Sequence, residues 1–302
     1  MIKRALCLSG GGAKGAYQVG ALKALSESGR SWNSVHGISV GALNAAWFAM
    51  LKPEDQPGSI GGLLAIWNGI KTSSDIYKPW APLGINYIMS MWKGSLNSGA
   101  PLRALVTKMW DSEKAKASGV KLTVGCCSLT TTRYHSILGD NPKILEYILA
   151  SSHLPLVFEP LLIDEEVWVD GGLRHQIPII EAIKENPDEI DVIITQPILN
   201  FKTSRCPNSE VKSAPQVSMR AANIFSDQIY FEDCMAIVRL INGEGKKHHI
   251  KVNFYFPSKL PAIDSMNFDG VSIQKVIQMG YEETKAKMAL NKQFSDIVLD
   301  EE

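Results

Sequence analysis

A serine flanked by glycines is the feature that most constrains the fold. It is Ser39, at the centre of a pentapeptide that runs from Gly37 to Gly41. A short extended run precedes the pentapeptide, and an Ala/Leu-rich run with helical spacing follows it over residues 42–51. A strand, a sharp turn and a helix in this order expose a serine hydroxyl at a helix N-terminus, because the glycines leave room for the turn. The pattern therefore indicates an α/β fold with a nucleophilic serine.

A glycine-rich loop near the N-terminus lies between a predicted strand, residues 5–9, and a predicted helix that begins at residue 16. Such a loop gathers backbone N–H groups at a helix N-terminus and can bind an anion. Its residues are Gly10, Gly11, Gly12, Ala13, Lys14 and Gly15.

Two functions compete for this loop. Its glycine spacing matches a dinucleotide-binding fingerprint, which also needs an acidic residue at the end of the second strand. That place is taken here by the serine pentapeptide. A P-loop is excluded because Gly15, rather than Ser or Thr, follows Lys14. We therefore interpret the loop as an oxyanion-binding loop for chemistry at Ser39, with a dinucleotide-binding module as the weaker alternative.

Strands and helices alternate along the rest of the chain, which indicates one α/β domain over residues 1–302 with a mainly parallel sheet. We expect a loop over residues 52–59. The aromatic and apolar region 76–92 either packs on the sheet or forms a lid or membrane-facing edge. Further strands are predicted at 121–128, 133–138, 166–170, 190–195 and 251–256, and helices at 63–70, 102–110, 143–150, 213–241 and 271–290.

The composition excludes some classes of protein. Lys and Arg number 31, as do Asp and Glu, so the balanced charge does not suggest a nucleic-acid binder. No apolar run is long enough to span a membrane, and the N-terminus lacks the apolar core of a secretory signal. The five cysteines have no metal-binding spacing, which favours buried reduced thiols in a cytoplasmic protein.

Asp170 is the candidate base for the serine. It ends a predicted strand and precedes Gly171 and Gly172, which allow a close backbone approach. The alternative is a turn aspartate that hydrogen-bonds its own backbone. His175 or His248 would complete a Ser–Asp–His order, but neither lies where a hydrolase of that order places its histidine, and we assign no histidine to catalysis.

Taken together, three motifs resemble the patatin-like phospholipase family: the glycine loop with Lys14, the Ser39 pentapeptide, and the triplet that begins at Asp170. Residues 101–103, 150–155 and 158–160 add to the resemblance, which covers about residues 3–200. The combination is far more specific than any one motif.

The resemblance implies a three-layer fold and a Ser39–Asp170 dyad that acts without histidine, metal or cofactor. Backbone N–H groups of Gly11, Gly12 and Ala13 would bind the oxyanion. Lys14 stands where the family usually has arginine. A lysine keeps the positive charge but lacks the planar guanidinium group that can form two parallel hydrogen bonds.

The implied activity is lipid degradation: hydrolysis of acyl esters of phospholipids or lysophospholipids through an acyl-serine, at a transient membrane surface. An alternative is a phospholipase effector of a bacterial defence or virulence system, gated by an activating ligand or protein, with residues 200–302 regulatory. The resemblance leaves room for a homodimer.

Overall fold

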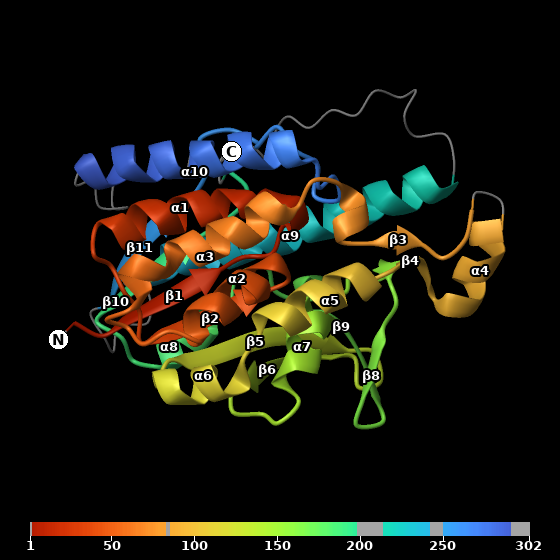
Figure 1. Ribbon diagram of the computed structural model, residues 1–302, viewed down its shortest axis with the longest axis horizontal. Helices are drawn as coiled ribbons and strands as arrows, with labels where there is room; N and C mark the ends of the chain where they lie inside the picture. The colour runs from red at the N-terminus through yellow and green to blue at the C-terminus, as the bar shows by residue number, and fades with distance from the viewer. Residues whose placement is uncertain (1, 83–84, 198–213, 242–249, 291–302) are drawn as a thin grey trace.

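The computed structural model describes residues 2–82, 85–197, 214–241 and 250–290. Within these ranges a central sheet of eight strands has the order β11-β10-β1-β2-β5-β9-β8, with β6 beside β5. The strands from β11 to β5 are parallel, whereas β6 and β9 run antiparallel to β5 (Figure 1). The strands are β1 (Arg4–Leu8), β2 (Ser34–Ile38), β5 (Lys121–Ser128), β6 (Arg133–Leu138), β8 (Leu161–Ile163), β9 (Glu166–Asp170), β10 (Glu189–Ile193) and β11 (Lys251–Tyr255).

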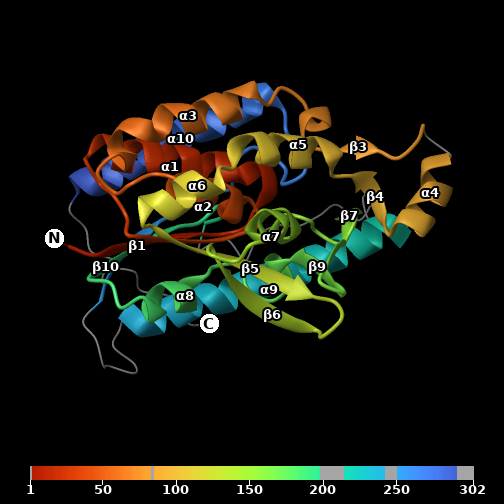
Figure 2. The same ribbon diagram turned by 60° about the horizontal axis from the view of Figure 1, so that its bottom comes forward.

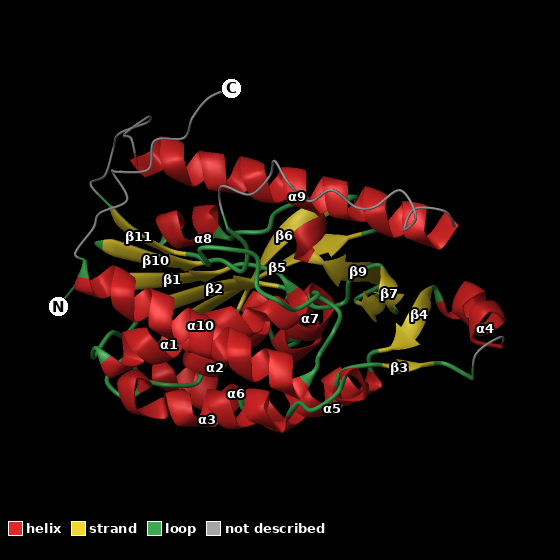
Figure 3. Cartoon of the chain, turned by 90° about the horizontal axis from the view of Figure 1, so that it is seen from above, coloured by secondary structure: helices red, strands yellow, loops and turns green. Residues whose placement is uncertain are grey.

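Helices cover both faces of the sheet (Figure 3). One face carries α1 (Ala16–Glu27), α2 (Val40–Ala49), α3 (Gln56–Gly69) and α10 (Gly270–Ala289), and the other carries α8 (Ile179–Lys184) and α9 (Ala214–Ile241). Figure 2 shows α5 (Ala100–Met109) and α6 (Ser112–Ser118) on the side of α1. The expected α/β fold, with a mainly parallel central sheet and helices on both faces, is confirmed.

The two layers of helices explain the apolar composition of the central strands. Neighbouring strand residues point to opposite faces. Leu6 and Leu8 therefore belong to one hydrophobic core, and Ala5 and Cys7 to the other. A parallel strand buried on both faces carries a continuous apolar run.

A second, three-stranded sheet lies at one end of the molecule (Figure 1). It is formed by β3 (Lys78–Pro79), β4 (Ser95–Ser98) and β7 (Leu156–Phe158), and α4 (Ile85–Lys93) extends beyond it. The side chains of the region 76–92 differ in their burial. Ile76 is buried in the main core, whereas Trp92 is 86% exposed. No described helix combines the length and the apolar character that a membrane span requires.

The strands at 121–128, 133–138 and 166–170 have the predicted bounds. The predicted loop over 52–59 is correct only for residues 52–55, which form a turn, and is wrong for 56–59. Helix α3 begins at Gln56, inside that range. Pro57 occupies its first turn, where a missing N–H costs nothing. The Gln56 side chain is buried and hydrogen-bonded to the backbone N–H and C=O of Trp32. Helices α6 and α8 were not predicted.

Candidate active site

Ser39 occupies a strained turn between β2 and α2. Its φ of 57° lies in the left-handed region, which costs a residue with a side chain about 1–3 kcal/mol. The flanking glycines make the turn possible. A Cβ on Gly37 would lie 2.3 Å from the carbonyl oxygen of Gly41, and a Cβ on Gly41 would lie 2.2 Å from that of Leu8. The structure thus gives a physical reason for both glycines of the pentapeptide.

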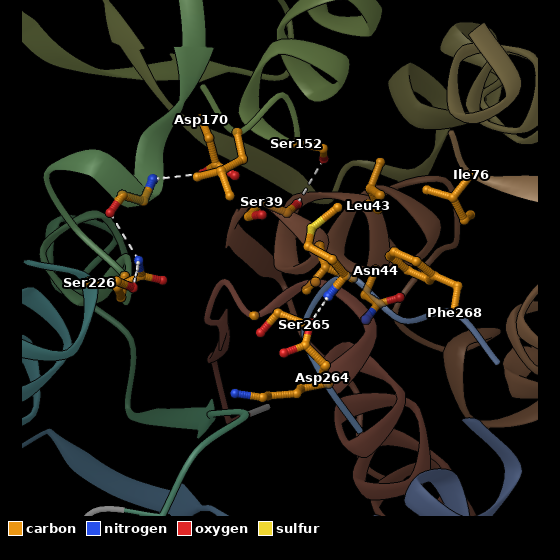
Figure 4. A pocket seen from close by; sticks show the side chains of 18 of the residues that line it. Ser39, Leu43, Asn44, Ile76, Ser152, Asp170, Ser226, Asp264, Ser265 and Phe268 are labelled. Atoms are coloured by element: carbon orange, nitrogen blue, oxygen red, sulfur yellow. Dashed lines mark hydrogen bonds between the residues drawn. The ribbon is translucent and has the colours of Figure 1, made fainter. Parts of the chain in front are cut away.

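Two serines at the C-terminal end of helix α7 (Ile144–Ser151) hold this turn: Ser151 is the last residue of the helix, and Ser152 is its C-cap. The Ser39 N–H donates to Ser151 Oγ at 2.9 Å, and Ser151 Oγ donates to the carbonyl oxygen of Gly125 at 2.7 Å. Ser152 Oγ donates to the carbonyl oxygen of Ser39 at 3.2 Å (Figure 4). The sequence analysis noted these serines as part of a resemblance, but no pattern in it indicated their contact with Ser39.

The structure brings the side chains of Ser39 and Asp170 together (Figure 4). The Ser39 hydroxyl faces the Asp170 carboxylate closely enough to affect its pKa, and the Gly172 N–H donates to Asp170 Oδ1 at 2.7 Å. Asp170 is 3% exposed. Burial raises the pKa of Asp170 to about 7, although the Gly172 hydrogen bond and the nearby Ser39 hydroxyl act to lower it. Gly171 is needed at this place because a Cβ there would lie 2.4 Å from the carbonyl oxygen of Gly125.

The glycine loop faces the same site, and its N–H groups differ in their partners. The Gly10 N–H donates to the carbonyl oxygen of Gln176, and the Ala13 N–H donates to that of Ser265 at 2.8 Å. Within the described part of the chain, the N–H groups of Gly11 and Gly12 have no acceptor. These two groups, rather than Ala13, are therefore available to an oxyanion in this structure.

Lys14 and Gly15 complete the loop. Lys14 lines the pocket in front of Ser39, where burial lowers its pKa and the charges of Asp264 and Asp227 oppose that shift. None of the carboxylates described by the structure lies within 4 Å of its ammonium group. Gly15 lies close against α2, where a Cβ on this residue would lie 2.5 Å from Val40 Cγ2.

The segment after Asp170 is fixed by α9. The Asp233 carboxylate accepts from the N–H groups of Gln176 at 2.6 Å and of Ile177 at 3.0 Å. Gln176 Nε2 in turn donates to the carbonyl oxygen of Gly172 at 2.9 Å and to Ser226 Oγ at 3.2 Å. Nothing in the sequence pattern indicated the contacts with α9, because they join residues 50 to 57 positions apart.

None of the described histidines hydrogen-bonds the side chain of Ser39 or Asp170. His175 Nδ1 lies 3.1 Å from Asp233, whose hydrogen bond raises the pKa of His175. His36 is buried, and burial lowers its pKa to about 3. His248 lies outside the described residues. Nor does any group of three or more His, Cys, Asp or Glu in the described ranges form a metal site.

A pocket of about 740 Å³ opens in front of Ser39. Figure 4 shows Leu43 and Ile76 on one side of Ser39 and Ser226 on the other. A serine hydroxyl beside a carboxylate with a raised pKa, near two backbone N–H groups without a described acceptor, is suited to acyl transfer. The apolar wall of the pocket is suited to an acyl chain.

The sequence model of a family described as patatin-like phospholipase matches residues 6–183. Among solved structures, the chain is similar to VipD from Legionella pneumophila, with a TM-score of 0.45 and 16% sequence identity. The similarity covers 96% of this chain and 67% of VipD. No curated protein sequence matches the chain.

Proposed function

The chain belongs to the patatin-like phospholipase family, and on this premise we propose that Ser39 and Asp170 form a dyad that hydrolyses acyl esters of phospholipids or lysophospholipids. The observation that carries the proposal is that the side chain of Ser39 lies beside that of the buried Asp170, at a largely apolar pocket. A carboxylate whose pKa is raised toward neutrality by burial is suited to accept a serine proton.

The reaction has two halves. In the first, Asp170 takes the proton of Ser39 while Oγ attacks the ester carbonyl, and the N–H groups of Gly11 and Gly12 stabilise the oxyanion. Asp170 then gives this proton to the departing alcohol, which leaves an acyl-serine. In the second half, Asp170 takes a proton from a water molecule as the water attacks the acyl-serine. Asp170 then gives this proton to Ser39 Oγ, which releases the fatty acid and restores Ser39.

Removal of either side chain tests the dyad. We expect Ser39→Ala to abolish hydrolysis of p-nitrophenyl butyrate and labelling by a fluorophosphonate probe. We expect Asp170→Asn to lower kcat/KM by about 10²–10⁴, because it removes the general base. Asp140→Asn, at an exposed turn, serves as the matched control and should keep full activity. Turnover at the wild-type rate by either of the first two variants would disprove the dyad.

A further inference from the structure

The peptide group between Gly10 and Gly11 lies against the serine. A Cβ on Gly10 would lie 3.4 Å from Ser39 Cβ, and Gly11 lines the pocket in front of Ser39. The N–H of this peptide group is one of the two in the glycine loop that have no acceptor within the described residues. Whether the Gly11 N–H can bind an oxyanion therefore depends on the direction in which the peptide group faces.

The carbonyl oxygen of the same peptide group sets that direction. The peptide bond is trans. In a trans peptide the C=O and the N–H point in opposite directions, because the whole group is planar. A contact that fixes the Gly10 carbonyl oxygen consequently fixes the Gly11 N–H as well, on the side opposite to the contact.

Two buried hydroxyl groups hold the Gly10 carbonyl oxygen. Thr195 Oγ1 donates to it at 2.7 Å, and Ser9 Oγ donates to it at 3.0 Å. Both side chains are fully buried, and neither lines the pocket. Because a carbonyl oxygen has two lone pairs, these two donors occupy both of its acceptor positions on the side away from the pocket. The Gly11 N–H is thereby left on the pocket side.

Thr195 is itself firmly placed, just after the carboxyl end of β10. The N–H of the preceding Ile194 donates to the carbonyl oxygen of Tyr255 in β11 at 2.9 Å. The N–H of the following Gln196 donates to the hydroxyl of Tyr230 in α9 at 3.2 Å, and Tyr230 is buried. The hydroxyl of Thr195 therefore comes from a support that is anchored on both sides, as a precise site requires.

The peptide group needs such a support because it lies between two glycines. Its rotation changes ψ of Gly10 and φ of Gly11, and neither residue has a Cβ that would resist the change. A rotated peptide would direct its partly negative carbonyl oxygen, instead of the N–H, toward an oxyanion. The next peptide group is held locally, since the Lys14 N–H donates to the carbonyl oxygen of Gly11 at 3.2 Å. The Gly10 carbonyl depends on Thr195, 185 positions away.

We propose that Thr195 is a positioning residue for the hydrolysis: with the help of Ser9, its hydroxyl orients the Gly10–Gly11 peptide group so that the Gly11 N–H faces the oxyanion. The inference rests on the proposed hydrolytic function. Thr195 acts only through Gly10 and does not line the pocket. Its hydroxyl therefore contributes to stabilisation of the transition state, and kcat depends on it, whereas KM and the ionisation of Asp170 do not.

Two substitutions separate the hydroxyl of Thr195 from its packing. Thr195→Val keeps the branched shape and removes the donor, and we expect kcat for p-nitrophenyl butyrate to fall by about tenfold to a hundredfold. This is somewhat less than the 10²–10³ that loss of a whole oxyanion donor costs, roughly, because Ser9 still holds the carbonyl. KM and the midpoint of the pH–activity profile should stay at their wild-type values. Thr195→Ser keeps the donor and should keep kcat within about threefold.

A merely structural role for Thr195 predicts the opposite order, because serine leaves a cavity where valine does not. Equal kcat in wild type and Thr195→Val, or a larger loss in Thr195→Ser than in Thr195→Val, would overturn the proposal. Thr123→Val is the matched control, because Thr123 of β5 is buried but lies outside the pocket lining, and it should keep kcat. If circular dichroism shows that Thr195→Val does not fold, Thr195→Ala replaces it, since alanine and serine differ only by the hydroxyl.

A transition-state analogue tests oxyanion binding directly. Addition of Ser39 Oγ to the carbonyl carbon of an alkyl trifluoromethyl ketone gives a tetrahedral adduct that carries an oxyanion, while Asp170 accepts the serine proton. The inhibition constant of this ketone should rise in Thr195→Val by the same factor by which kcat/KM falls. An unchanged inhibition constant beside a lowered kcat would overturn the proposal.

The outcomes separate the two proposals. If folded Thr195→Val keeps the wild-type kcat while hydrolysis is lost in Ser39→Ala, the assignment of Thr195 is wrong and the dyad stands. If the wild-type protein neither hydrolyses the ester nor binds the ketone, the dyad itself is wrong, and the inference about Thr195 falls with it.

Discussion

At the residue scale, the activity should depend on the protonation of Asp170. Burial raises the pKa of this carboxyl to about 7, and only the ionised form can accept the Ser39 proton. We therefore expect kcat/KM for p-nitrophenyl butyrate to be low at about pH 5, to rise with pH, and to level off above a midpoint near 7. A profile already flat at pH 5 would show that Asp170 titrates elsewhere or is not the base.

The candidate catalytic residues were easier to find in the sequence than the residues that hold them in place. Ser39, Asp170 and the glycines follow from local motifs, because a sharp turn or a strand end constrains the residue types beside it. Ser151 and Thr195 carry no such signal. Thr195 Oγ1 donates to the carbonyl oxygen of Gly10 at 2.7 Å, across 185 positions of sequence. One sequence does not encode that proximity in any local pattern, so the partners of the glycine loop could not be predicted.

At the scale of elements, α1 and α10 pack closely through two glycines. A Cβ on Gly20 would lie 1.9 Å from the carbonyl oxygen of Ile277, and a Cβ on Gly280 would lie 2.2 Å from that of Tyr17. We expect Gly20→Ala to lower the free energy of unfolding by about 1–3 kcal/mol through overpacking. Helix propensity alone favours alanine by about 1 kcal/mol. The close approach of the two helices is therefore the reason that we expect the substitution to destabilise the protein.

Gly61 provides the matched control for this prediction. It is exposed on α3, and a Cβ there would have no neighbour within 4 Å. Gly61→Ala should therefore raise the free energy of unfolding by up to about 1 kcal/mol. Urea denaturation of both variants measures the difference, and stabilisation by Gly20→Ala would contradict the close packing.

Helix α4 is the element that we expect to contact lipid. Its Trp92 is 86% exposed and Ile85 is 60% exposed, and tryptophan is favoured at membrane surfaces. We expect Trp92→Ser to weaken sedimentation with phosphatidylcholine vesicles by about tenfold, because burial of a large apolar side chain is worth about 1.5–3 kcal/mol. Ile180→Ser on α8, where the side chain is 52% exposed, is the control. Equal losses in the two variants would rule out a specific role for α4.

Regular elements were predicted well where the apolar pattern was long or strictly bounded, as in β5, β6 and β9. The start of α3 was missed because its first turn is polar and contains Pro57, which resembles a loop in sequence. The first residue of the helix, Gln56, is held by buried hydrogen bonds to the backbone of Trp32, which cannot be read from the sequence. The strands β3, β4 and β7 are short, and they depend on pairing between distant segments rather than on their own residues.

At the scale of the whole molecule, residues beyond the family match complete the site. The carbonyl oxygen of Ser265 accepts the Ala13 N–H, and a Cβ on Gly12 would lie 2.1 Å from the same oxygen. Asp227 of α9 and Asp264 line the pocket. The sequence analysis gave residues 200–302 a regulatory role only under the alternative of a gated effector. We propose that the described part of this region, 214–241 and 250–290, shapes the glycine loop and supplies charged residues to the lining of the pocket.

Asp233 of α9 offers a test of this dependence. Its carboxylate accepts from the N–H groups of Gln176 and Ile177, and Gln176 contacts Gly172, which donates to Asp170. Asp233→Ala would leave two backbone N–H groups without their acceptor, at about 1–3 kcal/mol each where they are buried. The Gly172 bond lowers the pKa of Asp170, so a loosened loop should move the midpoint of the pH–activity profile above its wild-type value of about 7.

We also expect kcat of Asp233→Ala to fall by about tenfold with little change in KM, because the carboxylate is displaced from the serine while the apolar wall of the pocket is intact. Glu232→Ala is the matched control. This neighbour on α9 is exposed and hydrogen-bonds only Gln228 within the described residues, so neither kcat nor the midpoint should change. A merely structural role for Asp233 would lower stability and leave the midpoint in place. The shift of the midpoint therefore distinguishes a helix that positions the base from one that only packs on the sheet.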